Sequence, residues 1–217
     1  MQTLPIFPLH TVLFPGTPIQ LHIFEERYIQ MMQDCLESDG RFGVALIEKG
    51  REALGPLARP FELGCSAVIR EIEPLDDGRM LLVAQGVERV RIAEIISTHP
   101  YLTASVEVQP VLGKEHPDVN TASNGLFPLI HRYLEIVAAE VAGELSSFQL
   151  PDEPTALAYL TGSLMQIPLS EKQSLLALES ATELISTTKD TLRREIALQR
   201  AMQDRSPADA YGSFGLN

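Results

Sequence analysis

Few residues of this 217-residue sequence occur in spacings that could support catalysis. The phosphate-binding pattern GxxxxGK(S/T), the nucleophile pattern GxSxG and the zinc-binding pattern HExxH are absent from it. Ser170 and Lys172 could form a Ser/Lys pair, but residues two apart on a helix do not face each other, and a helix cap explains Ser170 better. His116 and Asp118 could contact a metal ion, but they lie in a segment that reads as a linker. The sequence therefore predicts no catalytic residue, no metal site and no cofactor.

The composition restricts the partners of the protein. Its 29 acidic and 17 basic residues give a net charge of −12, and such a field repels the phosphates of nucleic acids. Cys35 and Cys65 belong to no CxxC pair, so we expect reduced, buried thiols rather than a zinc site or a disulfide. No apolar run approaches the roughly 18 residues of a membrane span, and the first residues do not resemble a signal peptide. These features predict a cytoplasmic protein that contacts neither nucleic acid nor membrane.

Residues 1–110 have the pattern of a small β-barrel. Apolar and polar residues alternate over 19–23 and 102–108, as they do in half-buried strands. The Asp-Gly pair at 77–78 predicts a hairpin turn, because glycine accepts the positive φ that such tight turns need. The period changes to three or four residues over 25–37, which predicts one helix there. Many short strands with a single helix are typical of a partly closed barrel.

The rest of the chain is predicted to be helical. The alternation is lost over 111–123, which we expect to be a linker. Residues 124–203 carry apolar residues at helical spacing and form a predicted helical bundle, in which Asp152 caps one helix and Ser180 another. Residues 204–217 lack such a pattern and are expected to form an extended tail. The predicted fold class is therefore α+β, with a β-rich subdomain followed by a helical one.

A series of short segments resembles the N-terminal substrate-binding domain of the Lon protease family. The segments are LPIFPL at 4–9, VLFPG at 12–16, IFEERY at 23–28, FGVAL at 42–46, GCSAVI at 64–69, LDDGR at 75–79, QGVERVRI at 85–92 and IPLSEKQSLL at 167–176. The resemblance implies a PUA-like β pseudo-barrel followed by a C-terminal α-helical bundle. The ATPase and Ser/Lys peptidase modules of a full-length Lon protease would begin beyond Asn217, so the resemblance to a stand-alone domain implies neither ATP use nor proteolysis.

The resemblance also implies a function, namely non-catalytic binding of unfolded or flexible polypeptides. Such a module could serve a separate protease or ATPase as an adaptor, or act as a holdase, and the sequence does not distinguish the two. Two other functions stay open. A cleft between barrel and bundle could bind or convert a small molecule if perturbed carboxylates lined it. RNA binding, which some PUA-like barrels perform, would require a basic stripe on one face.

The candidate polypeptide-binding surface combines a turn with a helix that follows it closely in sequence. It consists of Phe14, Pro15, Glu26, Arg27 and Gln30. A large apolar side chain at a turn, beside mixed polar groups on an outer helix face, suits sequence-tolerant capture of extended chains. In the alternative interpretation, Phe14 folds inward, plugs the end of the barrel and contributes to stability instead.

Three arginines form a second candidate site, on a rim of the barrel. Arg89 and Arg91 alternate with apolar residues, so both are expected to point away from the core, and Arg79 follows the hairpin turn. Neighbouring strands place alternating residues on a common face, so we expect the three side chains to gather there. In such an acidic protein their expected partners are carboxylates.

Overall fold

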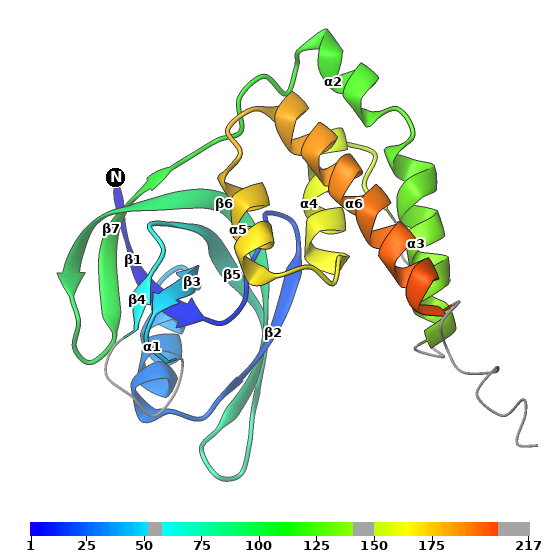
Figure 1. Ribbon diagram of the computed structural model, residues 1–217. Coiled ribbons are helices and arrows are strands. Elements are labelled where there is room, and N and C mark those ends of the chain that lie inside the picture. The colour runs from blue at the N-terminus through cyan, green and yellow to red at the C-terminus, as the bar shows by residue number, and fades with distance from the viewer. Residues whose placement is uncertain (52–57, 141–149, 204–217) are drawn as a thin grey trace, which may run out of the picture.

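The structure is a computed structural model that describes residues 1–51, 58–140 and 150–203. The predicted tail, 204–217, lies outside the described residues. A ring of strands and a group of helices stand side by side (Figure 1). The strands are β1 (Gln2–Leu9), β2 (Pro18–Ile23), β3 (Arg41–Lys49), β4 (Arg59–Pro60), β5 (Leu63–Pro74), β6 (Met80–Ser97) and β7 (Leu102–Val108). The helices are α1 (Glu26–Leu36), α2 (Pro117–Ser123), α3 (Leu126–Glu140), α4 (Pro154–Leu164), α5 (Leu169–Ala177) and α6 (Ala181–Gln203).

The strands of the first half close into a ring. Antiparallel pairing runs from β1 through β7, β6 and β5 to β3, and β3 returns to β1 in parallel, with Ile6 opposite Gly43. Closure satisfies the backbone groups that would otherwise remain at two sheet edges. Met31 and Met32 of α1 join the apolar core of the ring. This arrangement confirms the predicted β pseudo-barrel.

The hairpin of β5 and β6 carries an additional strand. Its turn is centred on Gly78, which has a φ of +82°, and the Leu75 N–H donates to the Arg79 carbonyl at 2.8 Å. The Asp-Gly turn predicted from the sequence is thereby confirmed. On the other side of β6, β2 pairs with it from Pro18 opposite Gln85 to the end of the strand. β2 is therefore attached to the ring through β6 alone among the described strands.

The helices of the second half share one apolar core with part of the barrel. Ile130 of α3, Leu157 of α4 and Leu184 of α6 belong to this core. Val12 and Phe14, from the connection between β1 and β2, belong to it as well. The helical bundle is thus packed onto one end of the barrel (Figure 1). The α+β prediction, a PUA-like β pseudo-barrel followed by an α-helical bundle, is confirmed.

The segment predicted to be a linker, 111–123, is helical in its second half. α2 occupies that half, and Val119 is buried in the core of the bundle. The Nζ of Lys189 in α6 donates to the carbonyls of Ala122 at 2.7 Å and Asn124 at 3.0 Å, at the end of α2. Because of these contacts, α2 packs as a part of the bundle.

The cap of α4 differs from the predicted one. Glu153, not Asp152, holds the capping position, because Pro154 is the first helical residue. The Glu153 carboxylate accepts hydrogen bonds from the N–H groups of Thr155 at 2.9 Å and Ala156 at 2.6 Å. Side-chain oxygens in this position satisfy N–H groups that have no partner within the helix.

The two remaining cap predictions had different outcomes. Pro168 precedes α5, so Ser170 lies within its first turn and does not cap it. Ser180 caps α6, because its Oγ accepts a hydrogen bond from the Glu183 N–H at 3.4 Å. The second of these two predictions is confirmed and the first is wrong.

Candidate functional site

Phe14 is buried where the barrel meets the bundle. Its side chain has an exposed fraction of 0%, and its ring centroid lies 5.8 Å from that of Tyr159 in α4. The Phe14 carbonyl accepts hydrogen bonds from the Oγ1 of Thr17 at 2.8 Å and from its N–H at 3.2 Å. A Cβ added to Gly86 would lie 2.2 Å from the same carbonyl oxygen, so the close approach requires glycine there. Phe14 therefore plugs the end of the barrel, as the alternative interpretation held.

The other residues of the predicted surface do not surround Phe14. Pro15 is half-buried, while Glu26 and Gln30 are exposed on α1, which follows the far end of β2. The six residues of β2 separate the two segments, a distance of about 20 Å at 3.3 Å per residue. Arg27 contacts its own neighbours: its Nη2 lies 2.9 Å from a Glu25 carboxylate oxygen. A docking surface centred on Phe14 is therefore not formed.

Arg89 differs most from its prediction, because only 4% of it is exposed. Its Nε donates to the Gln109 carbonyl at 2.9 Å, and its Nη2 donates to that of Pro110 at 3.2 Å. Its Nη1 donates to the carbonyls of Leu176, at 2.8 Å, and Leu178. The guanidinium thus joins β6 to the end of α5. Alternation correctly placed Arg89 off the barrel core, but the bundle covers that side of the sheet.

The other two arginines remain at the surface and are far apart along the chain. Arg79 pairs with Asp77 at 2.6 Å beside the hairpin turn, and Arg91 lies 3.8 Å from Glu62. Their carboxylate partners agree with the prediction. Ten residues of strand separate Arg79 from Arg89, which corresponds to about 33 Å. The three arginines therefore form no common rim, and they do not supply the basic stripe that RNA binding would require.

The cavity between barrel and bundle contains no pair of carboxylates. Its volume is ≈ 280 Å³, and Lys172 is the one titratable residue among the residues that line it. Burial lowers the pKa of Lys172, whose Nζ donates to the Ser163 carbonyl at 2.7 Å. The cavity offers no arrangement for proton transfer between carboxylates, which the small-molecule hypothesis would require.

The thiols of Cys35 and Cys65 are both buried, in surroundings that disfavour the reactive thiolate form. Burial, together with the nearby Asp34 and Asp39 carboxylates, raises the pKa of Cys35 to about 12. Burial likewise raises the pKa of Cys65 to about 12. A thiol held in its protonated form is a poor nucleophile and a poor metal ligand. Among residues 1–51, 58–140 and 150–203, no three His, Cys, Asp or Glu side chains gather closely enough to hold a metal ion.

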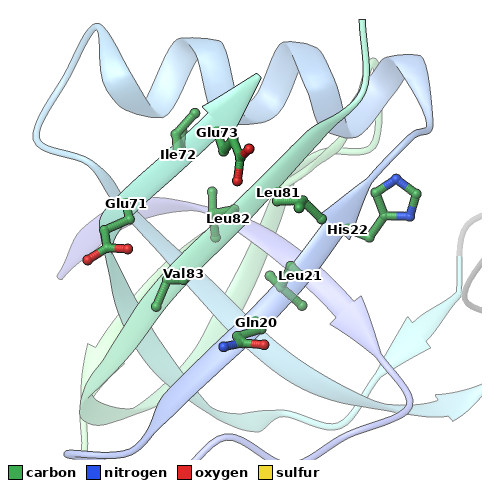
Figure 2. Close-up of a pocket in the computed structure, with 9 residues that line it drawn as sticks. All are labelled: Gln20, Leu21, His22, Glu71, Ile72, Glu73, Leu81, Leu82 and Val83. Carbon is green, nitrogen blue, oxygen red and sulfur yellow. The ribbon is translucent and has the colours of Figure 1, made fainter. Parts of the chain in front are cut away.

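A groove of ≈ 390 Å³ crosses the outer face of the sheet formed by β2, β6 and β5 (Figure 2). We call it the cross-strand groove. Register places two rows of side chains along it, one on each side: His22, Leu81 and Glu73 form the first row, and Gln20, Val83 and Glu71 the second. The middle row, Leu21, Leu82 and Ile72, completes the lining between them. Each of the two outer rows has a polar residue at both ends and an apolar one at its centre.

The chemistry of the cross-strand groove changes along its length. Leu81, which is 43% exposed, and Val83 form apolar walls where the groove crosses β6. Glu71 and Glu73 stand at the β5 end, and no described residue forms an ion pair or hydrogen bond with either carboxylate. The groove therefore combines an apolar centre with one acidic end.

The opposite end of the groove reaches an open sheet edge. β2 pairs with β6, and no other described strand pairs with it. In an edge strand, the backbone groups of every second residue point away from the neighbouring strand. The Gly86 N–H donates to the Thr17 carbonyl at 2.9 Å, so this carbonyl faces β6, as do the backbone groups of every second residue after Thr17. The N–H and carbonyl of Gln20 and His22 consequently point outward. The sequence PIQLHI of β2 contains no Lys or Glu of the kind that blocks edge pairing.

Sequence reasoning missed this groove. The alternation over 19–23 places His22 on the polar side of a strand, and His22 is exposed there, but the alternation does not identify its neighbours in space. The available signal was the uncharged alternating run of β2, which is unusual for an exposed edge. Alternation along β5 is enough to place Glu71 and Glu73 on one face, but their positions opposite Val83 and Leu81 follow only from the strand pairing.

A closed ring of strands with an attached helical bundle defines the class of the protein as an α+β fold built on a β pseudo-barrel. A family model for the substrate-binding domain of the ATP-dependent protease La (Lon) matches residues 3–194. The chain belongs to this family of Lon substrate-binding domains. In the described residues, no helix has both the length and the apolar character that crossing a membrane requires.

Curated relatives and solved structures agree with this assignment. The chain is 26% identical over 203 residues to Lon protease 1 of Herpetosiphon aurantiacus, covering 91% of this chain and 25% of that protein. It is 28% identical to Lon protease 2 of Myxococcus xanthus, covering 81% of this chain and 21% of that protein. The chain thus spans about a quarter of the length of these relatives.

Two solved structures share the fold. One is the Lon N-terminal domain protein from Xanthomonas campestris, with a TM-score of 0.59 and 23% identity, covering 86% of this chain and 96% of that one. The other is the N-terminal domain of Mycobacterium avium complex Lon protease, with a TM-score of 0.67 and 18% identity, covering 88% and 98%. At these identities the likeness concerns the fold.

Proposed function

We propose that this chain is a non-catalytic module that binds unfolded or flexible polypeptides in the cross-strand groove and along the free edge of β2. The single observation that carries the proposal is the position of an apolar groove directly beside an unpaired, uncharged strand edge. Membership of the Lon substrate-binding domain family supports a polypeptide as the ligand.

The free edge offers affinity that does not depend on the client sequence. An extended polypeptide can add a strand to β2 and form main-chain hydrogen bonds with the outward-facing groups of Gln20 and His22. Only a chain that is locally unfolded has its own backbone groups available for such pairing. The edge thereby favours unfolded segments over folded proteins.

The groove adds side-chain contacts to this main-chain pairing. Alternate side chains of an added strand lie on the face that carries Leu81 and Val83. Burial of apolar client side chains against these walls contributes about 25 cal/mol per Å² of apolar surface removed from water. Shallow walls of this kind suit many apolar side chains rather than one.

Two cellular roles are consistent with such a surface, an adaptor that passes clients to a separate protease or ATPase and a holdase that keeps them unaggregated. Affinity capture from native cytoplasm, read by mass spectrometry, separates them. If the protein is an adaptor, it captures a protease or ATPase, and the groove variants capture the same partner, because that partner would bind another surface. A holdase retains clients alone, and the groove variants lose them.

The binding site itself is tested with a fluorescently labelled, reduced and alkylated polypeptide that cannot refold. Leu81→Ser removes an apolar wall, and we expect binding about three- to tenfold weaker. Gln20→Pro removes the outward N–H of β2 without removing a bond to β6, and we expect a comparable loss. Fluorescence anisotropy gives both affinities, and urea unfolding verifies that the variants are folded.

Ile96→Ser is the matched control, because Ile96 is an exposed apolar residue of β6 outside the groove. A second measurement leaves the protein unchanged and replaces the client by a peptide with N-methylated alternate residues, which cannot donate to the edge. Equal affinities for all three variants and for the N-methylated peptide would refute the proposal.

A further inference from the structure

The cavity between barrel and bundle contains the amine of a lysine. Lys172 of α5 lines it, and the Lys172 Nζ donates to the Ser163 carbonyl, in the last turn of α4, at 2.7 Å. The other lining residues come from the connection between β1 and β2, from the start of β2 and from α4, and all of them are uncharged. Lys172 is half-buried and Pro18 is exposed, so small dissolved molecules can enter the cavity.

No carboxylate compensates the charge of this amine. Lys172 forms no ion pair with any residue that the structure describes. Its acidic neighbour in α5, Glu171, pairs with Arg194 of α6. Burial without a nearby anion disfavours the ammonium form and lowers the pKa of Lys172. Near neutral pH, a larger fraction of this amine is therefore neutral, and hence nucleophilic, than in an ordinary lysine.

The cavity also has room for an acyl group on the amine. Its volume is ≈ 280 Å³, whereas one water molecule occupies about 30 Å³ in the liquid. Acylation converts the buried cation into a neutral amide, which removes the cost of burying a charge. The amide N–H keeps a donor for the Ser163 carbonyl, and the hydroxyl of Thr11, which lines the cavity, is a donor available to the new carbonyl oxygen.

We propose that Lys172 is a modification site that accepts a small acyl group from an activated donor, an acyl phosphate or a thioester. The lone pair of the neutral Nζ attacks the acyl carbon and forms the N–C bond. The C–O bond of the acyl phosphate, or the C–S bond of the thioester, breaks, and phosphate or thiolate leaves with the electron pair. The Nζ proton passes to solvent, and the step requires no oxidant or reductant.

This inference goes beyond the proposed function and does not depend on it. The cavity lies at the barrel–bundle contact, whereas the cross-strand groove lies on the outer face of β2, β6 and β5. Acylation is measured on the protein alone, without a polypeptide client. Failure of either idea therefore leaves the other intact.

Acetylation of the folded protein by acetyl phosphate, read by mass spectrometry, compares the four lysines of the chain. Lys189 is the matched reference, because it is also half-buried and donates to two carbonyls but does not line the cavity. A weaker base is also a weaker nucleophile, which offsets part of the gain in neutral amine. At about pH 7.5 we therefore expect Lys172 to react about three- to tenfold faster than Lys189.

Acetyl coenzyme A is used in parallel to distinguish the two kinds of donor. A preference for Lys172 with either reagent supports the site and identifies its donor. Reaction at Lys172 that is no faster than at Lys189 with both reagents overturns the inference.

Two further measurements on the unmodified protein test the physical cause. The acetylation rate at Lys172 should level off at a lower pH than that of a lysine in a short unstructured peptide, as its lowered pKa requires. In guanidinium chloride that unfolds the chain, the burial is lost, and Lys172 and Lys189 should react within about twofold of each other. A pH profile that matches the peptide, or a preference that persists in the unfolded chain, overturns the inference.

Thr11→Asp places a carboxylate in the lining of the cavity. It should stabilise the ammonium form of Lys172 and slow its acetylation at least about threefold relative to Lys189. Thr11→Asn has nearly the same shape without the charge, and it is the matched control, which should react as the unmodified protein does. Equal rates in the two variants overturn the inference, and the pH profile of the unmodified protein decides it if Thr11→Asp does not fold.

Discussion

Two regions of the molecule differ in how completely their polar groups are used. At the contact between barrel and bundle, Arg89 donates to four backbone carbonyls and Phe14 is fully buried against α4. In the cross-strand groove, Glu71 and Glu73 have no described partner and the outer edge of β2 is unpaired. In the first region these side chains serve contacts within the fold, whereas in the second they remain open to solvent.

The difference shows that residue type alone does not identify a binding site. Phe14 and the arginines were the more conspicuous residues in the sequence, yet two of them hold the two parts of the fold together. The groove consists of ordinary strand residues. They are available to a ligand because the bundle does not cover this face of the sheet. We therefore expect substitutions at the barrel–bundle contact to affect stability and substitutions in the groove to affect binding.

The largest effect is expected for Phe14→Ala. Removal of a fully buried aromatic side chain leaves a cavity, and we expect a loss of about 3–5 kcal/mol in the free energy of unfolding. Urea unfolding measures it, and Phe14→Leu, which retains most of the volume, should lose less. The folded fraction should bind polypeptide as the unmodified protein does. A small stability loss together with weaker binding would restore Phe14 as a contact residue.

A smaller but still large effect is expected for Arg89→Met. The substitution leaves the carbonyls of Leu176 and Leu178 without their donor, and unsatisfied buried groups cost about 1–3 kcal/mol each, so we expect a loss of about 2–4 kcal/mol. Arg91→Met, at an exposed position of the same strand, should stay within about 0.5 kcal/mol. Equal losses in the two variants would contradict the buried role of Arg89.

The cap of α4 gives an intermediate effect that depends on pH. Burial raises the pKa of the Glu153 carboxyl, but the hydrogen bonds from Thr155 and Ala156 outweigh burial, so the pKa is lowered. A lowered folded-state pKa contributes stability that is present above the unfolded-state pKa and is lost as pH falls through the folded-state value. We expect Glu153→Ala to cost about 1 kcal/mol at pH 7.

Thermal unfolding of both proteins across a pH series tests the cap. The difference in stability between the unmodified protein and Glu153→Ala should decrease as the pH falls below about 4.5, the range in which an unperturbed Glu gains its proton. A difference that is constant across this range would show that the carboxylate contributes packing rather than a charged cap.

The smallest effect on stability is expected in the groove. Glu71→Gln/Glu73→Gln breaks no described ion pair and lowers the excess of negative charge, so the free energy of unfolding should change by less than about 0.5 kcal/mol. Urea unfolding alongside Glu94→Gln, at an exposed carboxylate of β6 outside the groove, measures it. A loss larger than about 1 kcal/mol, the size of one good hydrogen bond, would indicate a structural role for these carboxylates.

The sequence predicted the fold well because strand and helix periodicity depend on local pattern. Alternation over 102–108, the Asp-Gly hairpin turn and the helix near α1 were all found in the structure. Alternation also indicated correctly that Arg89 points away from the barrel core. It could not indicate that the bundle, contributed by residues far along the chain, covers that side.

The groove could not be predicted for a related reason. It requires β2 to pair with the first half of β6 while β5 pairs with the other side of the same strand. Such pairing between distant segments is set by tertiary topology. Alternation along β5 places Glu71 and Glu73 on one face, but it does not indicate which strands lie beside them. The polar ends of the groove, His22 and Glu73, are about 50 residues apart in sequence, and no local pattern links residues so distant.

Hydrogen–deuterium exchange of the full chain, with and without the unfolded polypeptide, tests the central claim most directly. Backbone amides at an open edge exchange readily, and pairing with a client strand protects them. We predict slower exchange in peptides that cover β2 in the presence of the client, with no change in those that cover Phe14 or α1. Protection confined to α1 or to the barrel–bundle contact, with β2 unchanged, would contradict the account.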